Sequence, residues 1–349
     1  ACICYGLIQS HMYGNLREGH EYGQTGIMLL ERSSDTTLHA RIHFFSSIFI
    51  DAWNLHWKQL SEKLLKSIES RTGSLMYSSL ACIHYILWNP ALTVTRALEH
   101  VQKYTPLVQA SNKQSAINGL SIVNHYLLAL SGKTRVPTSF DTPQLNELEL
   151  LVRIEKGDDY TRIVHFHLYK LILSYHFHHI DEAETHFKEI QNYSESILGT
   201  PWMIEASFYS FMFLAKTHKP LANSHYLYLL NNELEKMTMW ATHCPENTQH
   251  LLLLMQGEYA RLEERGADAH MFYKNALESA KENGFLKFEA LANELMGLFY
   301  FEDGNEEIAS YFFKASLSCY QKWGAYAKVE SLVSSYSFLS ESDTLITGQ

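Results

Sequence analysis

Four consecutive residues, Ser131-Gly132-Lys133-Thr134, carry the GK[ST] ending of a phosphate-binding loop. That motif holds phosphate with backbone N–H groups and a lysine, and it also requires an earlier glycine, which would fall at position 127. Leu127 stands there instead, and the segment before the motif has the pattern of a helix rather than a strand. We therefore interpret these four residues as a plain loop and expect no nucleotide cofactor.

Histidine is abundant, with 19 residues in the chain. A group of five lies close together in sequence: His165, His167, His176, His178 and His179. A zinc site needs three or four ligands that converge at about 2 Å. On one helix the i, i+3 pair at 176 and 179 could form a two-ligand clip, but 165 and 176 would lie about 16 Å apart. We expect surface or helix-end histidines and no metal, and whether the group binds one stays open.

No local motif for hydrolysis is present, because the chain contains neither G-x-S-x-G nor H-E-x-x-H. The paired carboxylates Glu263-Glu264 and Glu306-Glu307 fall in polar turns between helical segments. A solvated charged turn is the ordinary explanation of such pairs. We therefore expect no catalytic residue and no enzymatic activity in this chain, and we keep a helical enzyme with a cryptic site as the less favoured alternative.

The helices that would position any site follow a repeated pattern between Pro245 and Leu332. Gly257 returns as Gly297 and Tyr273 returns as Phe313, and the positions in both pairs differ by 40. Small and aromatic residues at a fixed period of this size are typical of stacked helical hairpins. The sequence therefore predicts an all-α, superhelical array of antiparallel helix hairpins, a tetratricopeptide-like solenoid with a period of about 40 residues.

Breaks in the pattern divide the chain. The strongest break is polar and contains two of the seven prolines. We predict N-terminal helical repeats over 1–130, a loop within the solenoid over 131–143, tetratricopeptide-like repeats over 144–339 and a frayed tail over 340–349. Inside the first segment we expect a turn at 71–74 and a helix that ends before Pro106. At the other end of the chain we expect a final helix over 325–338. The chain should contain about sixteen helices and no strand.

Composition excludes several classes of protein. Hydrophobic residues make up 46% and charged residues 19%, which indicates a folded rather than a disordered chain. The net charge of −10 and the absence of a Lys/Arg-rich block argue against nucleic acid as a partner. The chain contains no run of 18 apolar residues, so no membrane span is predicted. The five scattered cysteines predict buried free thiols in a reducing, cytoplasmic compartment.

Four phrases resemble the helical-repeat region of very large bacterial signalling proteins. They are WATHCPEN from Trp240, GEYARLEERGADAHMFYKNALESAKENGF from Gly257, EALANELMGLFYFEDG from Glu289 and CYQKWGAYAKVESL from Cys319. A weaker likeness covers 5–50 and 156–198. Proteins of this family join a serine/threonine-kinase-like domain, a STAND-type AAA ATPase, the helical region, a GAF domain and a histidine kinase or cyclase output. The run Phe301-Glu302-Asp303 departs from the family, which has an apolar-to-basic run there.

The resemblance implies a non-catalytic sensor or protein-interaction module that relays binding to neighbouring domains of the same polypeptide. The expected partner is a protein or peptide, with a small-molecule-sensing regulatory domain as the alternative. The chain opens within a helical pattern and without Met, so we expect a fragment of a longer protein. The identity of the ligand and the oligomeric state do not follow from the sequence.

The register of the repeats predicts which side chains face the concave side of the solenoid, where peptides bind. The first helix of each hairpin supplies them, and they are of mixed polar, apolar and aromatic type. A merely solvated concave wall is the alternative. The predicted binding residues are His165, Leu168, Ile172, Tyr175, Leu254, Glu258, Arg261, Glu294, Leu298 and Phe301.

Overall fold

The computed structural model describes residues 1–33, 37–70, 75–217 and 220–340. These residues form eighteen α-helices and three short 3-10 helices, and a single bridge between Thr142 and Leu145 is their only β-type pairing. The predicted all-α class is confirmed. Within the described ranges no helix combines the length and apolar character needed to cross a membrane. The expected turn at 71–74 and residues 341–349 of the expected tail lie outside the description.

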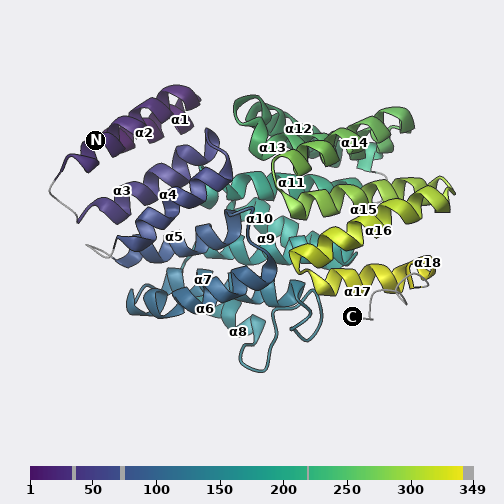
Figure 1. Cartoon of the computed structure of the whole chain (residues 1–349), viewed down its shortest axis with the longest axis horizontal. Helices are drawn as coiled ribbons and strands as arrows, with labels where there is room; N and C mark the ends of the chain where they lie inside the picture. The colour runs from purple at the N-terminus through teal and green to yellow at the C-terminus, as the bar shows by residue number, and fades with distance from the viewer. Residues whose placement is uncertain (34–36, 71–74, 218–219, 341–349) are drawn as a thin grey trace.

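Figure 1 shows the helices running as adjacent antiparallel neighbours. The N-terminal arm contains α1 (Cys2–Met12), α2 (Leu16–Glu31), α3 (His39–Phe49), η1 (Asp51–Trp53), α4 (Trp57–Glu69), α5 (Leu75–Trp88), α6 (Val94–Ala110) and α7 (Gln114–Leu130). The centre contains α8 (Glu147–Glu155), α9 (Tyr160–His176), α10 (Ile180–Tyr193), η2 (Ser194–Ile197) and α11 (Trp202–Lys216). The C-terminal arm contains η3 (Pro220–Ala222), α12 (Ser224–His243), α13 (Pro245–Leu262), α14 (Gly266–Glu282), α15 (Leu286–Glu302), α16 (Glu306–Trp323), α17 (Tyr326–Ser335) and α18 (Ser337–Ser340).

The repeated glycines lie where two helices of a hairpin approach most closely. A Cβ at Gly257 on α13 would be 2.5 Å from Cε1 of Tyr273 on α14. A Cβ at Gly297 on α15 would be 2.9 Å from the ring of Phe313 on α16. Real Cβ atoms do not tolerate such contacts, so only glycine lets each aromatic ring lie flat against the facing helix. This packing explains why a small residue and an aromatic residue recur together in the sequence.

Two predicted boundaries are wrong. Pro106 does not end a helix, because α6 continues through it to Ala110. Proline removes the hydrogen bond to the carbonyl of Gln102, but both residues are exposed, so water can solvate that carbonyl. The expected final helix over 325–338 is interrupted at Tyr336, which has an extended backbone and stacks on Phe313 with ring centroids 4.2 Å apart.

The prediction of buried thiols holds for Cys82, Cys244 and Cys319 and is wrong for Cys4, which is exposed, while Cys2 is half-buried. The two N-terminal cysteines lie on α1, the outermost helix of its arm, which packs mainly on α2 and α3. Burial raises the pKa of Cys82 and of Cys244 to about 12, so these thiols stay protonated at neutral pH.

The two arms close against each other around α9 and α11 (Figure 1). His56 hydrogen-bonds the carbonyl of Asn283 at 3.0 Å, and the Trp57 backbone N–H donates to Asn247 Oδ1 at 3.0 Å. The aromatic rings of Trp53 and Trp240 are also in contact, with centroids 5.7 Å apart. Between the arms, α9 packs mainly against α10, α7 and α11, and every residue of α9 from Arg162 to His176 is buried.

Candidate binding site

A pocket with a volume of about 650 Å³ opens beside the C-terminal end of α11. We call it the α11–α13–α15 pocket. Its polar lining residues are His178, Lys216, Thr217, Glu258, Arg261 and Glu302. Apolar side chains form the remainder: Ile180, Ala215, Leu221, Ala222, Leu262, Leu295, Leu298 and Phe299. Ligand sites typically combine an apolar wall with polar groups in this way.

Lys216 is the last residue of α11 and extends from a helix that is otherwise almost fully buried. Its ammonium nitrogen lies 4.0 Å from the centroid of the Tyr175 ring, a cation–π contact. Among the described residues no ion pair involves Lys216, because both carboxylates that line the pocket pair with Arg261. Burial lowers the pKa of Lys216 to about 8, although the charge of Glu294 acts to raise it.

Arg261, in contrast, is fully neutralised. Its guanidinium lies 2.9 Å from Glu258 on the same helix and 3.1 Å from Glu302 on α15. The Glu258 carboxylate also accepts a hydrogen bond from the Tyr273 hydroxyl at 2.6 Å. The charge of Glu258 holds the pKa of Arg261 above its ordinary value. Arg261 therefore shapes one wall of the pocket and has little attraction left for an anion.

A buried ion pair lies close to the pocket. The Lys328 ammonium on α17 is 2.7 Å from the carboxylate of Glu294 on α15. The same carboxylate accepts from the Tyr320 hydroxyl at 2.8 Å, and the Lys328 ammonium also donates to the His176 carbonyl at 2.6 Å. Burial is the largest single influence and acts to raise the pKa of Glu294, but the charge and hydrogen bond of Lys328, with smaller contributions from His176 and Lys216, together hold the pKa at about 2. This saturated network fixes α15 and α17 against α9.

The structure gathers only part of the predicted concave-face set around the pocket. Glu258, Arg261 and Leu298 line it. Glu294 belongs to the ion pair just described. Phe301 points elsewhere, because its ring contacts Tyr336 and Phe338 at centroid distances of 5.2 and 6.1 Å.

The remaining predicted residues lie inside the molecule. His165, Leu168, Ile172 and Tyr175 on α9, with Leu254 on α13, are each at most 2% exposed. Neighbouring helices cover the residues on α9: the ring of His165 lies against Trp202 on α11, and the ring of Tyr175 lies against Tyr209 on the same helix. A ligand could reach them only if these packed helices separated.

Lys216 was missed from the sequence, and His178 was considered only as a member of the histidine group and not as part of a binding pocket. Lys216 ends the run WMIEASFYSFMFLAK, in which it is the only basic residue, so a cation at the edge of a buried helix was the available signal. His178 gave no comparable signal, because its place in the pocket depends on a left-handed backbone with φ of 61° just after α9. Burial lowers the pKa of His178 to about 4, with the Lys216 charge as the next cause, so its imidazole is neutral at pH 7.

The other sequence candidates lie apart from this pocket. Lys133 and Thr134 are in the loop after α7, beside a separate surface pocket. The Nδ1 atoms of His167 and His186 are 2.9 Å apart, and His176 Nε2 lies 3.2 Å from the Tyr209 hydroxyl. In the described part of the chain no three His, Cys, Asp or Glu side chains are grouped as metal ligands.

Comparison with known proteins adds no assignment, because no family model and no curated protein matches this chain.

Proposed function

We propose that this chain is a non-catalytic interaction module of a larger signalling protein. In this proposal it binds an acidic group of a partner protein or peptide in the α11–α13–α15 pocket. The Lys216 ammonium receives the acidic group, and the apolar wall receives the side chain next to it. The observation that carries the proposal is a half-buried lysine, open to the pocket, with which no carboxylate of the described residues forms an ion pair.

Charge complementarity supports an acidic ligand. A cation removed from water is costly unless a counter-charge compensates it. The chain as a whole has a net charge of −10, yet both acidic residues that line the pocket are already bound to Arg261. A ligand carboxylate would supply the direct ion-pair partner that Lys216 lacks and would return its pKa toward the ordinary value for lysine.

The position of the pocket also supports a relay to neighbouring domains. Lys216 is on a central helix, whereas Glu258 and Leu298 are on two different hairpins of the C-terminal arm. A ligand that contacts all three favours one arrangement of these helices over others, and a ligand shifts a conformational equilibrium only through such differential contacts. The kinase, ATPase and output domains of similar proteins would receive that shift.

The proposal is tested with a fluorescein-labelled hexapeptide of alternating Ala and Glu, titrated with the protein at pH 7 while anisotropy is recorded. Wild type should bind it, and Lys216→Gln should weaken binding at least tenfold. Lys188→Gln is the matched control, because Lys188 is exposed on α10 and pairs with Glu184 at 2.8 Å. An unchanged affinity in Lys216→Gln, or an equal loss in Lys188→Gln, would refute the assignment.

A further inference from the structure

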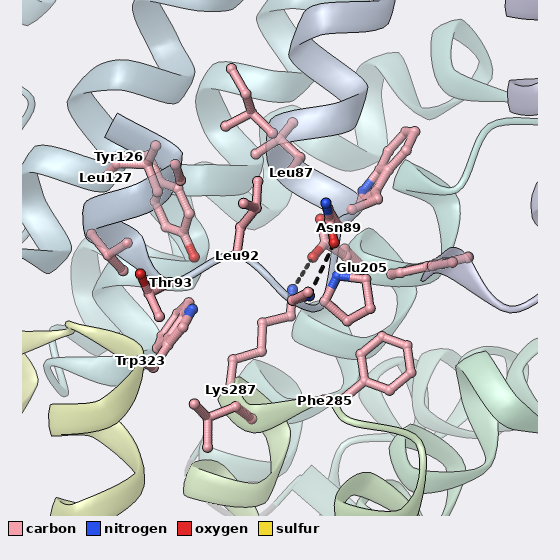
Figure 2. A pocket seen from close by; sticks show the side chains of 18 of the residues that line it. Leu87, Asn89, Leu92, Thr93, Tyr126, Leu127, Glu205, Phe285, Lys287 and Trp323 are labelled. Atoms are coloured by element: carbon pink, nitrogen blue, oxygen red, sulfur yellow. Dashed lines mark hydrogen bonds and ion pairs between the residues drawn. The ribbon is translucent and has the colours of Figure 1, made fainter. Parts of the chain in front are cut away.

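A second cavity lies at the centre of the molecule, where the two arms meet (Figure 2). Its walls come from distant parts of the chain: α4 and α5, the segment before α6, α7, α9, α11, and the segments around Phe285 and Trp323. Its volume is about 80 Å³. One buried water needs about 10–15 Å³, so there is room for a molecule of several non-hydrogen atoms.

Only two charged side chains are among the described residues that line this central cavity, Glu205 and Lys287. The Lys287 ammonium lies 2.6 Å from Glu205 Oε1, and Figure 2 draws this contact as a dashed line. Glu205 is 3% exposed, and its second oxygen, Oε2, is buried without a hydrogen-bond partner. A buried carboxylate oxygen without a donor costs about 1–3 kcal/mol, so this site is incomplete as it stands.

The positive side of the pair is half-buried, with the Lys287 side chain 21% exposed, and it has donors that no described protein group accepts. An ammonium group has three N–H donors, and the contact to Glu205 is the one hydrogen bond found for Lys287 among the described residues. The Lys287 nitrogen also lies 4.6 Å from the centroid of the Phe288 ring. The indole Nε1–H of Trp88, a residue that lines the same cavity, is buried without an acceptor. The cavity thus offers one free acceptor and several free donors.

The rest of the lining is mainly aromatic and apolar, and it includes Trp57, Tyr126, Tyr169, Phe285 and Trp323. Such walls favour an apolar body and, through their π faces, an ammonium group. Glu205 and Lys287 together carry no net charge. A ligand that is only a cation or only an anion would therefore bring an uncompensated charge into the cavity. A zwitterion, which has one charge of each sign, would not.

We propose that the central cavity binds a small zwitterion of the amino-acid type. Its ammonium group donates to Glu205 Oε2, its carboxylate accepts from Lys287 and Trp88, and its short apolar side chain lies against the aromatic wall. The site is distinct from the α11–α13–α15 pocket. Because the walls of the cavity belong to both arms, a bound ligand contacts both arms and stabilises the arrangement in which they touch.

The test is calorimetric titration of the whole chain with L-alanine and with L-leucine, accompanied by thermal unfolding at 10 mM of each. At least one should bind and raise Tm. For leucine, the probes 3-methylbutylamine and 4-methylpentanoate each lack one charged group, and propionate and ethylamine serve for alanine. Each analogue should bind at least tenfold more weakly than its parent, since it leaves either Glu205 or Lys287 uncompensated.

Variants give an independent check. Glu205→Gln and Lys287→Met should each weaken binding at least tenfold, whereas Lys281→Met, an exposed position on α14, should bind as wild type does. Lys216→Gln should also bind normally, which separates this site from the one in the proposed function. The absence of binding by both amino acids, or analogues that bind as tightly as their parents, would overturn the proposal even if a variant fails to fold.

Discussion

The Lys328 ammonium on α17 lies 2.7 Å from the Glu294 carboxylate on α15, and neither side chain is more than 4% exposed. The pair is therefore a buried ionic contact between two helices of the C-terminal arm. Lys328 also donates to the carbonyl of His176, 152 positions earlier in the chain. One side chain thus holds the last long helix against the central helix α9.

Replacing Lys328 by Met should lower the free energy of unfolding by about 3–5 kcal/mol, because it leaves the Glu294 charge buried without its partner. Urea denaturation monitored by circular dichroism measures the change. The double variant Lys328→Met with Glu294→Gln should recover part of the loss. Lys314→Met changes an exposed position on α16, and its free energy of unfolding should stay within about 0.5 kcal/mol of the wild-type value. A neutral effect of Lys328→Met would mean that the pair is not formed.

Gly257→Ala should destabilise the chain by about 1–3 kcal/mol. The added Cβ would meet Tyr273, which is fully buried and bonded through its hydroxyl to Glu258, so the ring cannot move away. Gly266→Ala is the control on the neighbouring helix, since its Cβ would make only an ordinary contact at 3.7 Å with Phe299. Equal stability of the two variants in urea would show that the close approach is absent.

Stability should fall as the pH decreases from 6.5 toward 3. Burial lowers the pKa of His176 and of His250 to about 3, with smaller effects from the neighbouring lysines. The unfolded chain therefore binds protons at a higher pH than the folded chain, and the stabilisation present above 6.5 is lost as pH falls. For each histidine, one unit of pKa difference between the folded and the unfolded chain corresponds to about 1.4 kcal/mol of unfolding free energy. His250→Gln should reduce the slope of unfolding free energy against pH, and an unchanged slope would contradict this.

The affinity for the acidic hexapeptide should decrease between pH 7 and pH 9. The ligand requires a charged Lys216, whose pKa of about 8 in the free protein means that most of these amines lose their proton by pH 9. A bound carboxylate raises that pKa, so affinity declines gradually through this range. Lys216→Arg keeps its charge at pH 9, and its affinity should vary less. If wild type and Lys216→Arg showed the same pH dependence, Lys216 would be excluded as the group whose deprotonation lowers the affinity.

The helices could be predicted from the sequence because their signals are local. The pairing of Gly257 with Tyr273 and of Gly297 with Phe313 appears in the sequence as a fixed spacing. The closure of the arms could not be predicted, because it depends on contacts such as that between His56 and Asn283, 227 positions apart. A contact between residues so far apart in the chain leaves no periodic pattern in the sequence.

The same limit explains the outcome at the candidate site. Register assigned Glu258, Arg261 and Leu298 to one face, and all three line the same pocket, since they lie on two adjacent hairpins with local patterns. Register also assigned His165 to the concave face, but its ring packs against Trp202 on α11 and is buried. The central pair of Glu205 and Lys287 is 82 positions apart and carries no sequence signal at all.

The central claim is that an acidic partner segment binds in the α11–α13–α15 pocket. Photo-crosslinking tests it most directly, with the acidic hexapeptide carrying benzoylphenylalanine next to one glutamate and the adducts mapped by mass spectrometry. The account predicts adducts on residues that line the pocket, such as Leu262, Leu298 and Phe299, and their loss in Lys216→Gln but not in Lys188→Gln. Adducts spread over the outer helices, or unchanged in Lys216→Gln, would contradict it.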